Sequence, residues 1–213
     1  ENGTPTWQRL RAALGADLVA LYGPEHGVFG KVGAGKHVSG ERHGIDRNND
    51  GKISKDEETG IKVFSLYGDT RKPTQRMLDG IDVMVYDLQD VGCRSYTYIS
   101  TLGLVMEAAQ EKGIEVMVLD RPNPLGTFRV EGPRPQGDLV ISSFIGQYDI
   151  PYVYGLTIGE LAKWINEVYL RRPCRLTVIP MKGWTQRMTW EDTGLKWVPT
   201  SPNIPITRCA RGY

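Results

Sequence analysis

Short apolar runs recur along the chain and alternate with stretches of a different periodicity. The runs are rich in Val, Ile, Leu and aromatic residues and lack strict polar alternation, which is typical of strands buried on both faces in a parallel sheet. This pattern predicts strands at 18–22, 62–67, 82–88, 115–120 and 176–181.

Helical periodicity fills two of the intervals between these runs. Within 96–112, apolar side chains recur at the spacing i, i+4, i+7 and i+8, which places them on one face of a helix. The stretch 157–171 opens with Thr157 and Glu160, whose spacing is that of a capping box. A Thr-Pro pair at 4–5 predicts the start of a further helix. We interpret the apolar stripes of these helices as core packing.

Strands that alternate with helices predict an α/β fold. We expect a Rossmann-like, mostly parallel sheet flanked by helices over residues 1–170. The remaining residues, 171–213, begin with a strand-like run and continue as a Pro- and Trp-rich stretch without clear periodicity. They predict the start of a smaller C-terminal domain, or the connection to it.

Composition excludes several classes of partner. The 213 residues carry 26 Lys and Arg against 25 Asp and Glu, a net charge of +1, so electrostatics do not favour nucleic acid or an anionic membrane. No apolar run approaches the roughly 18 residues needed to cross a bilayer. The three cysteines have no C-x-x-C spacing, which indicates neither a zinc site nor a disulfide framework.

A glycine-rich stretch, FGKVGAGKHVSG at 29–40, reproduces much of the phosphate-binding pattern G-x-x-x-x-G-K-[ST]. The hydroxyl residue that would hold Mg²⁺ is replaced by His37, and no helical period follows Lys36. We therefore expect no nucleotide cofactor. The glycines instead favour a loop that passes above the sheet.

Polar side chains collect where three of the predicted strands end. In a doubly wound sheet, ligands bind outside the carboxyl ends of the strands, so these positions are the first candidates for a site. Each acid taken alone could equally cap a helix. The candidates are Glu25 and His26 after the first run, Asp87 and Asp90 after the third, and Asp120, Arg121 and Asn123 after the fourth.

The stretch DRNNDGKISKDE, residues 46–57, matches every ligand position of an EF-hand calcium loop. It has no amphipathic helix before it and no second loop to pair with, so we expect structural Ca²⁺ that holds an insertion in place rather than a calcium sensor. The expected ligands are Asp46, Asn48, Asp50, the Lys52 carbonyl, Ser54 and Glu57, with Gly51 at the sharp turn.

Several longer motifs occur along the chain in a fixed order. They are LYGPEHGVFG, SLYG with KPT, DVMVYDLQDVGCRSYTYISTL, VLDRPNPLG, VEGP, TIGELA, VIPMKGW and DTGLKWVPTSPNIP. In this order they resemble one bacterial family, the NamZ-type exo-β-N-acetylmuramidases, over about residues 10 to 205. The resemblance implies a glycoside hydrolase that removes N-acetylmuramic acid (MurNAc) from the non-reducing end of peptidoglycan fragments, in a secreted or periplasmic protein.

Cleavage of a glycosidic bond needs a carboxylic acid for the leaving oxygen and a second group at the oxocarbenium-like centre. Glu25 is our candidate for the acid, with His26 beside it to tune its protonation. Asp87, Asp90, Asp120 and Glu131 compete for the second role. We expect the sugar, its acetamido group or its lactyl carboxylate to be bound by Arg94, Tyr96, Arg121 and Asn123, with Tyr98 buried by its helix.

Two other classes of function fit parts of the sequence. A non-catalytic, calcium-stabilised carbohydrate-binding or scaffold module would use the loop at 46–57 and need no catalytic acid. A nucleotide-dependent enzyme would use the glycine-rich stretch, against which His37 argues.

Overall fold

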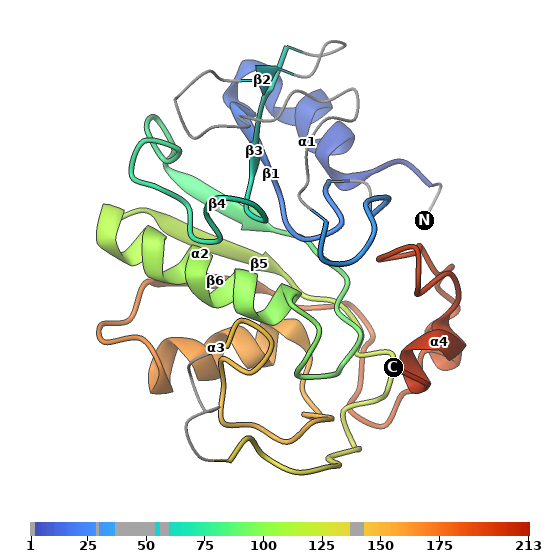
Figure 1. Ribbon diagram of the computed structural model, residues 1–213. Coiled ribbons are helices and arrows are strands. Elements are labelled where there is room, and N and C mark those ends of the chain that lie inside the picture. The colour runs from blue at the N-terminus through green and yellow to red at the C-terminus, as the bar shows by residue number, and fades with distance from the viewer. Residues whose placement is uncertain (1–2, 29, 37–53, 56–59, 137–142) are drawn as a thin grey trace.

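The computed structural model describes residues 3–28, 30–36, 54–55, 60–136 and 143–213 (Figure 1). Short turns of 3-10 helix follow α1 at Gly15–Asp17 and precede the C-terminal helix at Glu191–Thr193. The remaining elements are α1 (Thr6–Leu14), β1 (Ala20–Gly23), β2 (Ser54–Lys55), β3 (Lys62–Ser65), β4 (Val83–Tyr86), α2 (Tyr98–Lys112), β5 (Glu115–Leu119), α3 (Ile158–Val168), β6 (Arg175–Ile179) and α4 (Thr207–Arg211).

The strands form two three-stranded sheets, and most of their pairings are parallel. In one sheet, of order β1-β3-β2, β1 pairs parallel with β3 and only the short β2 is antiparallel. In the other, of order β4-β5-β6, both pairings are parallel. The predicted α/β architecture is confirmed. Since β6 joins this sheet, the sheet continues past residue 170, and the proposed start of a second domain near that point stays a prediction.

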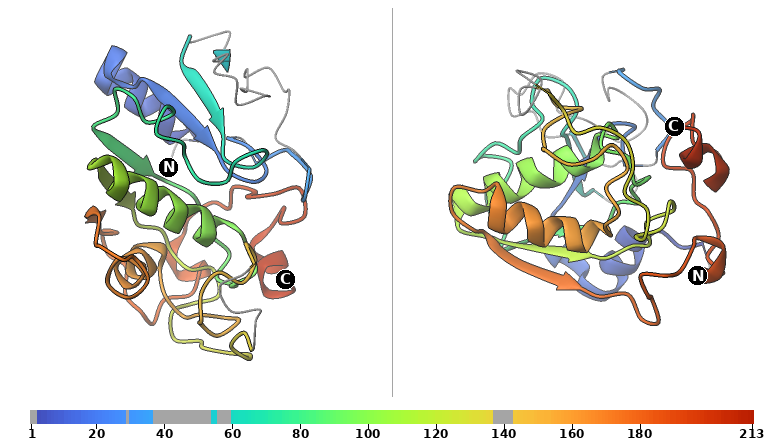
Figure 2. Two further views of the ribbon diagram at one scale, coloured as in Figure 1. Left: turned by 60° about the vertical axis from the view of Figure 1, so that its left-hand side comes forward. Right: turned by 90° about the horizontal axis from the view of Figure 1, so that it is seen from below.

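Two helices pack side by side on the same face of the β4-β5-β6 sheet. Figure 2, seen from below, shows α2 and α3 together above β5 and β6. The expected stripe of α2 is buried, and its helix ends at Gly113, whose φ of 77° is the left-handed conformation of a helix end. The capping box of α3 is present, with the Thr157 hydroxyl accepting from the Glu160 amide. The helices are therefore where their periodicity placed them.

No helix in the described ranges is both long enough and apolar enough to cross a membrane.

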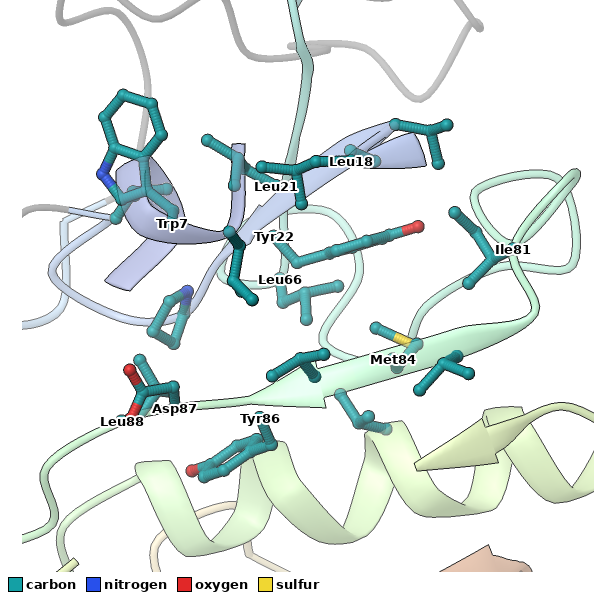
Figure 3. A pocket seen from close by; sticks show the side chains of 18 of the residues that line it. Trp7, Leu18, Leu21, Tyr22, Leu66, Ile81, Met84, Tyr86, Asp87 and Leu88 are labelled. Carbon is teal, nitrogen blue, oxygen red and sulfur yellow. The ribbon is translucent and has the colours of Figure 1, made fainter. Parts of the chain in front are cut away.

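The strands β4 and β6 differ from the expectation that every strand is buried on both faces. In β4, Met84 and Tyr86 are buried, whereas Val83 and Val85 are each 40% exposed, and no residue of β6 is fully buried. The two valines line an apolar cavity of about 220 Å³ that lies between β4 and β1 (Figure 3). The physical reason is that side chains alternate between the faces of a strand, and α2 and α3 pack on only one face of this sheet.

Candidate active site

Glu25 lies in the turn that follows β1 and is 7% exposed. The backbone N–H of Gly35 donates to its Oε1 at 2.9 Å, and the Thr97 hydroxyl donates to its Oε2 at 2.6 Å. Gly35 has a φ of 69°, a conformation that a glycine adopts at little energetic cost. The described part of the glycine-rich stretch, residues 30–36, thus folds back over Glu25, and the Gly35 N–H orients its carboxylate.

His26 adopts an unusual backbone conformation. Its φ of 71° is positive, which no other non-glycine residue of the described ranges shows. The ring Nδ1 lies 2.7 Å from the Val32 carbonyl oxygen. Because a carbonyl oxygen can only accept, Nδ1 carries a proton, and in the neutral ring Nε2 is the nitrogen with the lone pair. His26 therefore holds the loop that contains Glu25.

A tyrosine cluster packs beneath this loop. The Tyr96 ring lies 6.1 Å from His26 and 4.7 Å from Tyr98 between ring centroids, and Tyr213 lies 5.7 Å from it on another side. The Tyr98 hydroxyl donates to the Thr200 carbonyl, which ties α2 to the C-terminal part of the chain. Burial raises the pKa of Tyr96 to about 12. Both tyrosines are buried, as expected for Tyr98, whereas sequence reasoning had placed Tyr96 against the substrate.

Asp90 and Asn123 tie the loops that follow β4 and β5 to the segment at residues 154–156. The Gly92 N–H and the Tyr154 hydroxyl both donate to Asp90 Oδ1. Complete burial raises the pKa of Asp90 to about 6, although these hydrogen bonds act in the opposite direction. Asn123 Oδ1 accepts from the Leu125 N–H, and its Nδ2 donates to the Leu156 carbonyl. Both side chains are buried, and the Asn123 amide and Asp90 Oδ1 are bonded within the protein, whereas Asp90 Oδ2 is buried with no hydrogen-bond partner among the described residues.

Asp87, Asp120 and Arg121 form a second polar group at the same strand ends. Arg121 Nε lies 2.6 Å from Asp87 Oδ1 in an ion pair. Asp120 accepts three hydrogen bonds, from the N–H groups of Arg121 and Gly159 and from the Thr157 hydroxyl. Partial burial raises the pKa of Asp120. These bonds tie β5 to the start of α3, so the carboxylate of Asp120 serves the structure of the fold.

Arg94 and Glu131 lie on more exposed loops. The Arg94 N–H donates to the Tyr152 carbonyl, and its guanidinium carbon lies 5.8 Å from the centre of the Tyr152 ring. The Glu131 side chain is 50% exposed and forms an ion pair of 2.7 Å with Arg129. Its backbone pairs with Val153 across an isolated bridge. Of the five candidate carboxylates, Glu131 is the one most open to solvent.

Sequence reasoning missed the side chains that surround Glu25. Thr97 contacts it directly, and Tyr67 lies close enough that the Glu25 charge, after burial, contributes to raising the pKa of Tyr67. The guanidinium of Arg71 lies 5.5 Å from the centre of the Tyr67 ring and 4.3 Å from that of Phe144. Their only sequence signal was position, since Thr97 lies at the start of the predicted helical stretch 96–112 and Tyr67 ends a predicted strand.

The family model described as "Exo-beta-N-acetylmuramidase NamZ, N-terminal" matches residues 1–208. The chain belongs to this NamZ N-terminal family. It is 47% identical over 196 residues to the peptidoglycan beta-N-acetylmuramidase NamZ of Bacillus subtilis (strain 168). That alignment covers 92% of this chain and 44% of the relative, so the chain spans less than half the length of this curated protein.

Two solved structures of Bacteroides fragilis NCTC 9343, both of DUF1343 family proteins, have the same fold. One is 48% identical with a TM-score of 0.81, covering 97% of this chain and 48% of that protein. The other is 29% identical with a TM-score of 0.66, covering 96% and 58%. Membership of the NamZ N-terminal family thus agrees with the resemblance carried by the motifs.

The predicted calcium loop of this NamZ-family chain, 46–57, lies almost entirely outside the described residues. Ser54, its ninth position, is described, and with Lys55 it forms β2, which pairs with β3. The described residues contain no cluster of three or more His, Cys, Asp or Glu side chains arranged to hold a metal. Calcium binding stays a prediction from the sequence.

Proposed function

We propose that this chain forms the acid-bearing part of a glycosidase that removes MurNAc from the non-reducing end of peptidoglycan fragments, outside the cytoplasmic membrane. The Bacillus subtilis relative, a peptidoglycan beta-N-acetylmuramidase, supports the substrate and the reaction. The observation that carries the proposal is Glu25, a buried carboxylate held by two hydrogen bonds at the carboxyl end of a parallel strand. Such an edge is where α/β sheets bind ligands.

Glu25 acts in this proposal as the general acid. The Gly35 N–H can only donate, so Oε1 must stay an acceptor, whereas the Thr97 hydroxyl can donate to an ionised Oε2 or accept from a protonated one. Oε2 is therefore the oxygen that can carry the transferable proton. That proton passes to the glycosidic oxygen as its bond to the anomeric carbon breaks, the aglycone leaves as an alcohol, and the oxygen of a water molecule finally takes its place on the anomeric carbon.

Glu131 is the carboxylate that we assign to the second role. The alternatives are bonded within the protein: Asp87 to Arg121, Asp90 to Tyr154 and Asp120 to the start of α3. Glu131 is half exposed, and its partner Arg129 lies only two residues away on the same loop. It can face a bound sugar without leaving a buried group unpaired.

The test is hydrolysis of a chromogenic β-MurNAc glycoside by the full-length protein. Glu25→Gln is expected to lower kcat by at least about 100-fold, the lower end for removal of a general acid, with unchanged thermal stability. Glu131→Gln is expected to lower kcat similarly. The matched control is Glu115→Gln. Glu115 lies at the amino end of β5, away from the carboxyl ends of the strands, and its carboxylate accepts a hydrogen bond from Thr177. Full activity of the Glu25→Gln variant would refute the assignment.

A further inference from the structure

The guanidinium of Arg71 lies over two neighbouring aromatic rings. Its guanidinium carbon lies 4.3 Å from the centre of the Phe144 ring and 5.5 Å from that of Tyr67, and the two ring centroids are 6.1 Å apart. Stacking fixes the plane of a guanidinium while leaving the N–H groups along its edge able to donate. No ion pair joins Arg71 to a carboxylate within the part of the chain that the structure describes.

The start of α2 places this stacked cation beside Glu25. Thr97, directly before the helix, donates its hydroxyl to Glu25 at 2.6 Å, and Ser100 donates its own to the Phe144 carbonyl at 2.6 Å. Residues three apart in a helix are separated by about 4.5 Å along its axis. Tyr67, the second ring under Arg71, agrees with this placement. Its pKa is raised mainly by burial and then by the negative charge of Glu25.

The arginines expected from the sequence have other partners. Arg121 is paired with Asp87, and Arg94 lies over Tyr152 with a long contact to the Pro133 carbonyl. Arg71 combines an exposed, oriented guanidinium with proximity to the candidate acid.

We propose that Arg71 binds the lactyl carboxylate of MurNAc and thereby makes the site selective for this sugar over N-acetylglucosamine. The two sugars differ by the lactyl ether at O3, whose carboxylate matches the two parallel N–H groups of a guanidinium. When Glu25 contacts the glycosidic oxygen of the bound sugar, the neighbouring Arg71 can contact the lactyl carboxylate at O3 of the same ring. This inference rests on the proposed function, since it names the part of the substrate that the same site recognises.

The experiment compares two chromogenic glycosides: β-MurNAc, and the same compound with its lactyl carboxyl converted to a primary amide. Arg71→Gln is expected to lower kcat/KM for the acid by roughly 10- to 100-fold, mainly through KM, because a charge-assisted hydrogen-bonded pair is lost. On the amide, the variant and the wild type are expected to differ by less than about threefold. Arg71→Lys, which keeps the charge but loses the fork, is expected to fall between them.

Arg175→Gln is the matched control, because Arg175 is an exposed arginine at the start of β6, paired with Glu115. It is expected to behave as wild type on both glycosides. An equal loss on acid and amide by Arg71→Gln, or no loss on either, would overturn the role of Arg71 while leaving hydrolysis intact. Failure of the wild type to cleave either glycoside would instead refute the proposed function, and with it this inference.

Discussion

Thr97 offers the sharpest test of how Glu25 is positioned. Thr97→Val keeps the shape of the side chain and removes the hydroxyl that donates to Glu25 Oε2 at 2.6 Å. Although Thr97 is the N-cap residue of α2, its side chain forms no hydrogen bond to the helix backbone. The substitution therefore removes the contact with Glu25 and leaves the capping of the helix unchanged.

The magnitude follows from the kind of bond that is lost. A hydrogen bond to a charged group contributes about 1.5 to 3 kcal/mol, which corresponds to roughly 10- to 100-fold if it acts in the transition state. We expect Thr97→Val to lower kcat on the chromogenic β-MurNAc glycoside by that factor. Because this hydrogen bond is stronger to the ionised carboxyl than to the protonated one, its loss should also shift the pH profile of kcat.

The assay is steady-state kinetics of the wild type, Thr97→Val and Thr97→Ser between pH 5 and pH 8, roughly the range in which catalytic carboxyls and imidazoles titrate. Thr97→Ser keeps the hydroxyl and is expected to retain most of the activity. Thermal melts separate a loss of folding from a loss of catalysis. If Thr97→Val had the kcat and pH profile of the wild type, the hydroxyl would not orient the catalytic carboxyl, and the reasoning would fail.

Three further predictions concern stability and metal binding. Because burial raises the pKa of Asp90 from 3.8 to about 6, its ionisation destabilises the fold as pH rises through that window. In thermal melts at a series of pH values, Asp90→Asn should thus raise Tm at pH 7. The gain should equal about 2 to 3 kcal/mol of unfolding free energy and should vanish below pH 4. A Cβ at Gly92, whose φ is 84°, would lie 2.3 Å from Asn123 Oδ1, so Gly92→Ala should lower the free energy of unfolding in urea by about 1 to 3 kcal/mol or more. Calorimetry should detect Ca²⁺ binding by the wild type at millimolar Ca²⁺ and none by Asp46→Ala, because Asp46 supplies the ligand at position 1 of the predicted loop. Equal heats from the two proteins would contradict the calcium loop.

Local signals in the sequence were enough to predict the helices α1 to α3, the strands β1 and β3 to β6, and the position of Glu25, but not β2 or α4. Hydrophobic periodicity located α2 and α3, and the pair Thr157 and Glu160 marked the start of α3 to the residue. The rule for strand ends placed Glu25 at the carboxyl edge because it depends only on the residue's position after β1. Each of these inferences uses residues that are neighbours along the chain.

Contacts between distant segments could not be predicted in the same way. Thr97 lies 72 positions from Glu25, and the ring of Phe144 meets Arg71 from a loop of no recognisable pattern. The strand-end rule also could not tell an acid that faces a ligand from one that ties a helix to a strand, as Asp120 does. The separation of β1 from β4 was equally hidden, since the composition of Val83 and Val85 is that of a covered strand.

Cleavage of the disaccharide MurNAc-β-1,4-GlcNAc by the full-length protein, followed by mass spectrometry, tests the central claim most directly. The account predicts that the wild type releases free MurNAc and GlcNAc, and that Glu25→Gln, equally folded by its thermal melt, releases neither. An intact disaccharide after incubation with the wild type, or equal release by the variant, would contradict it.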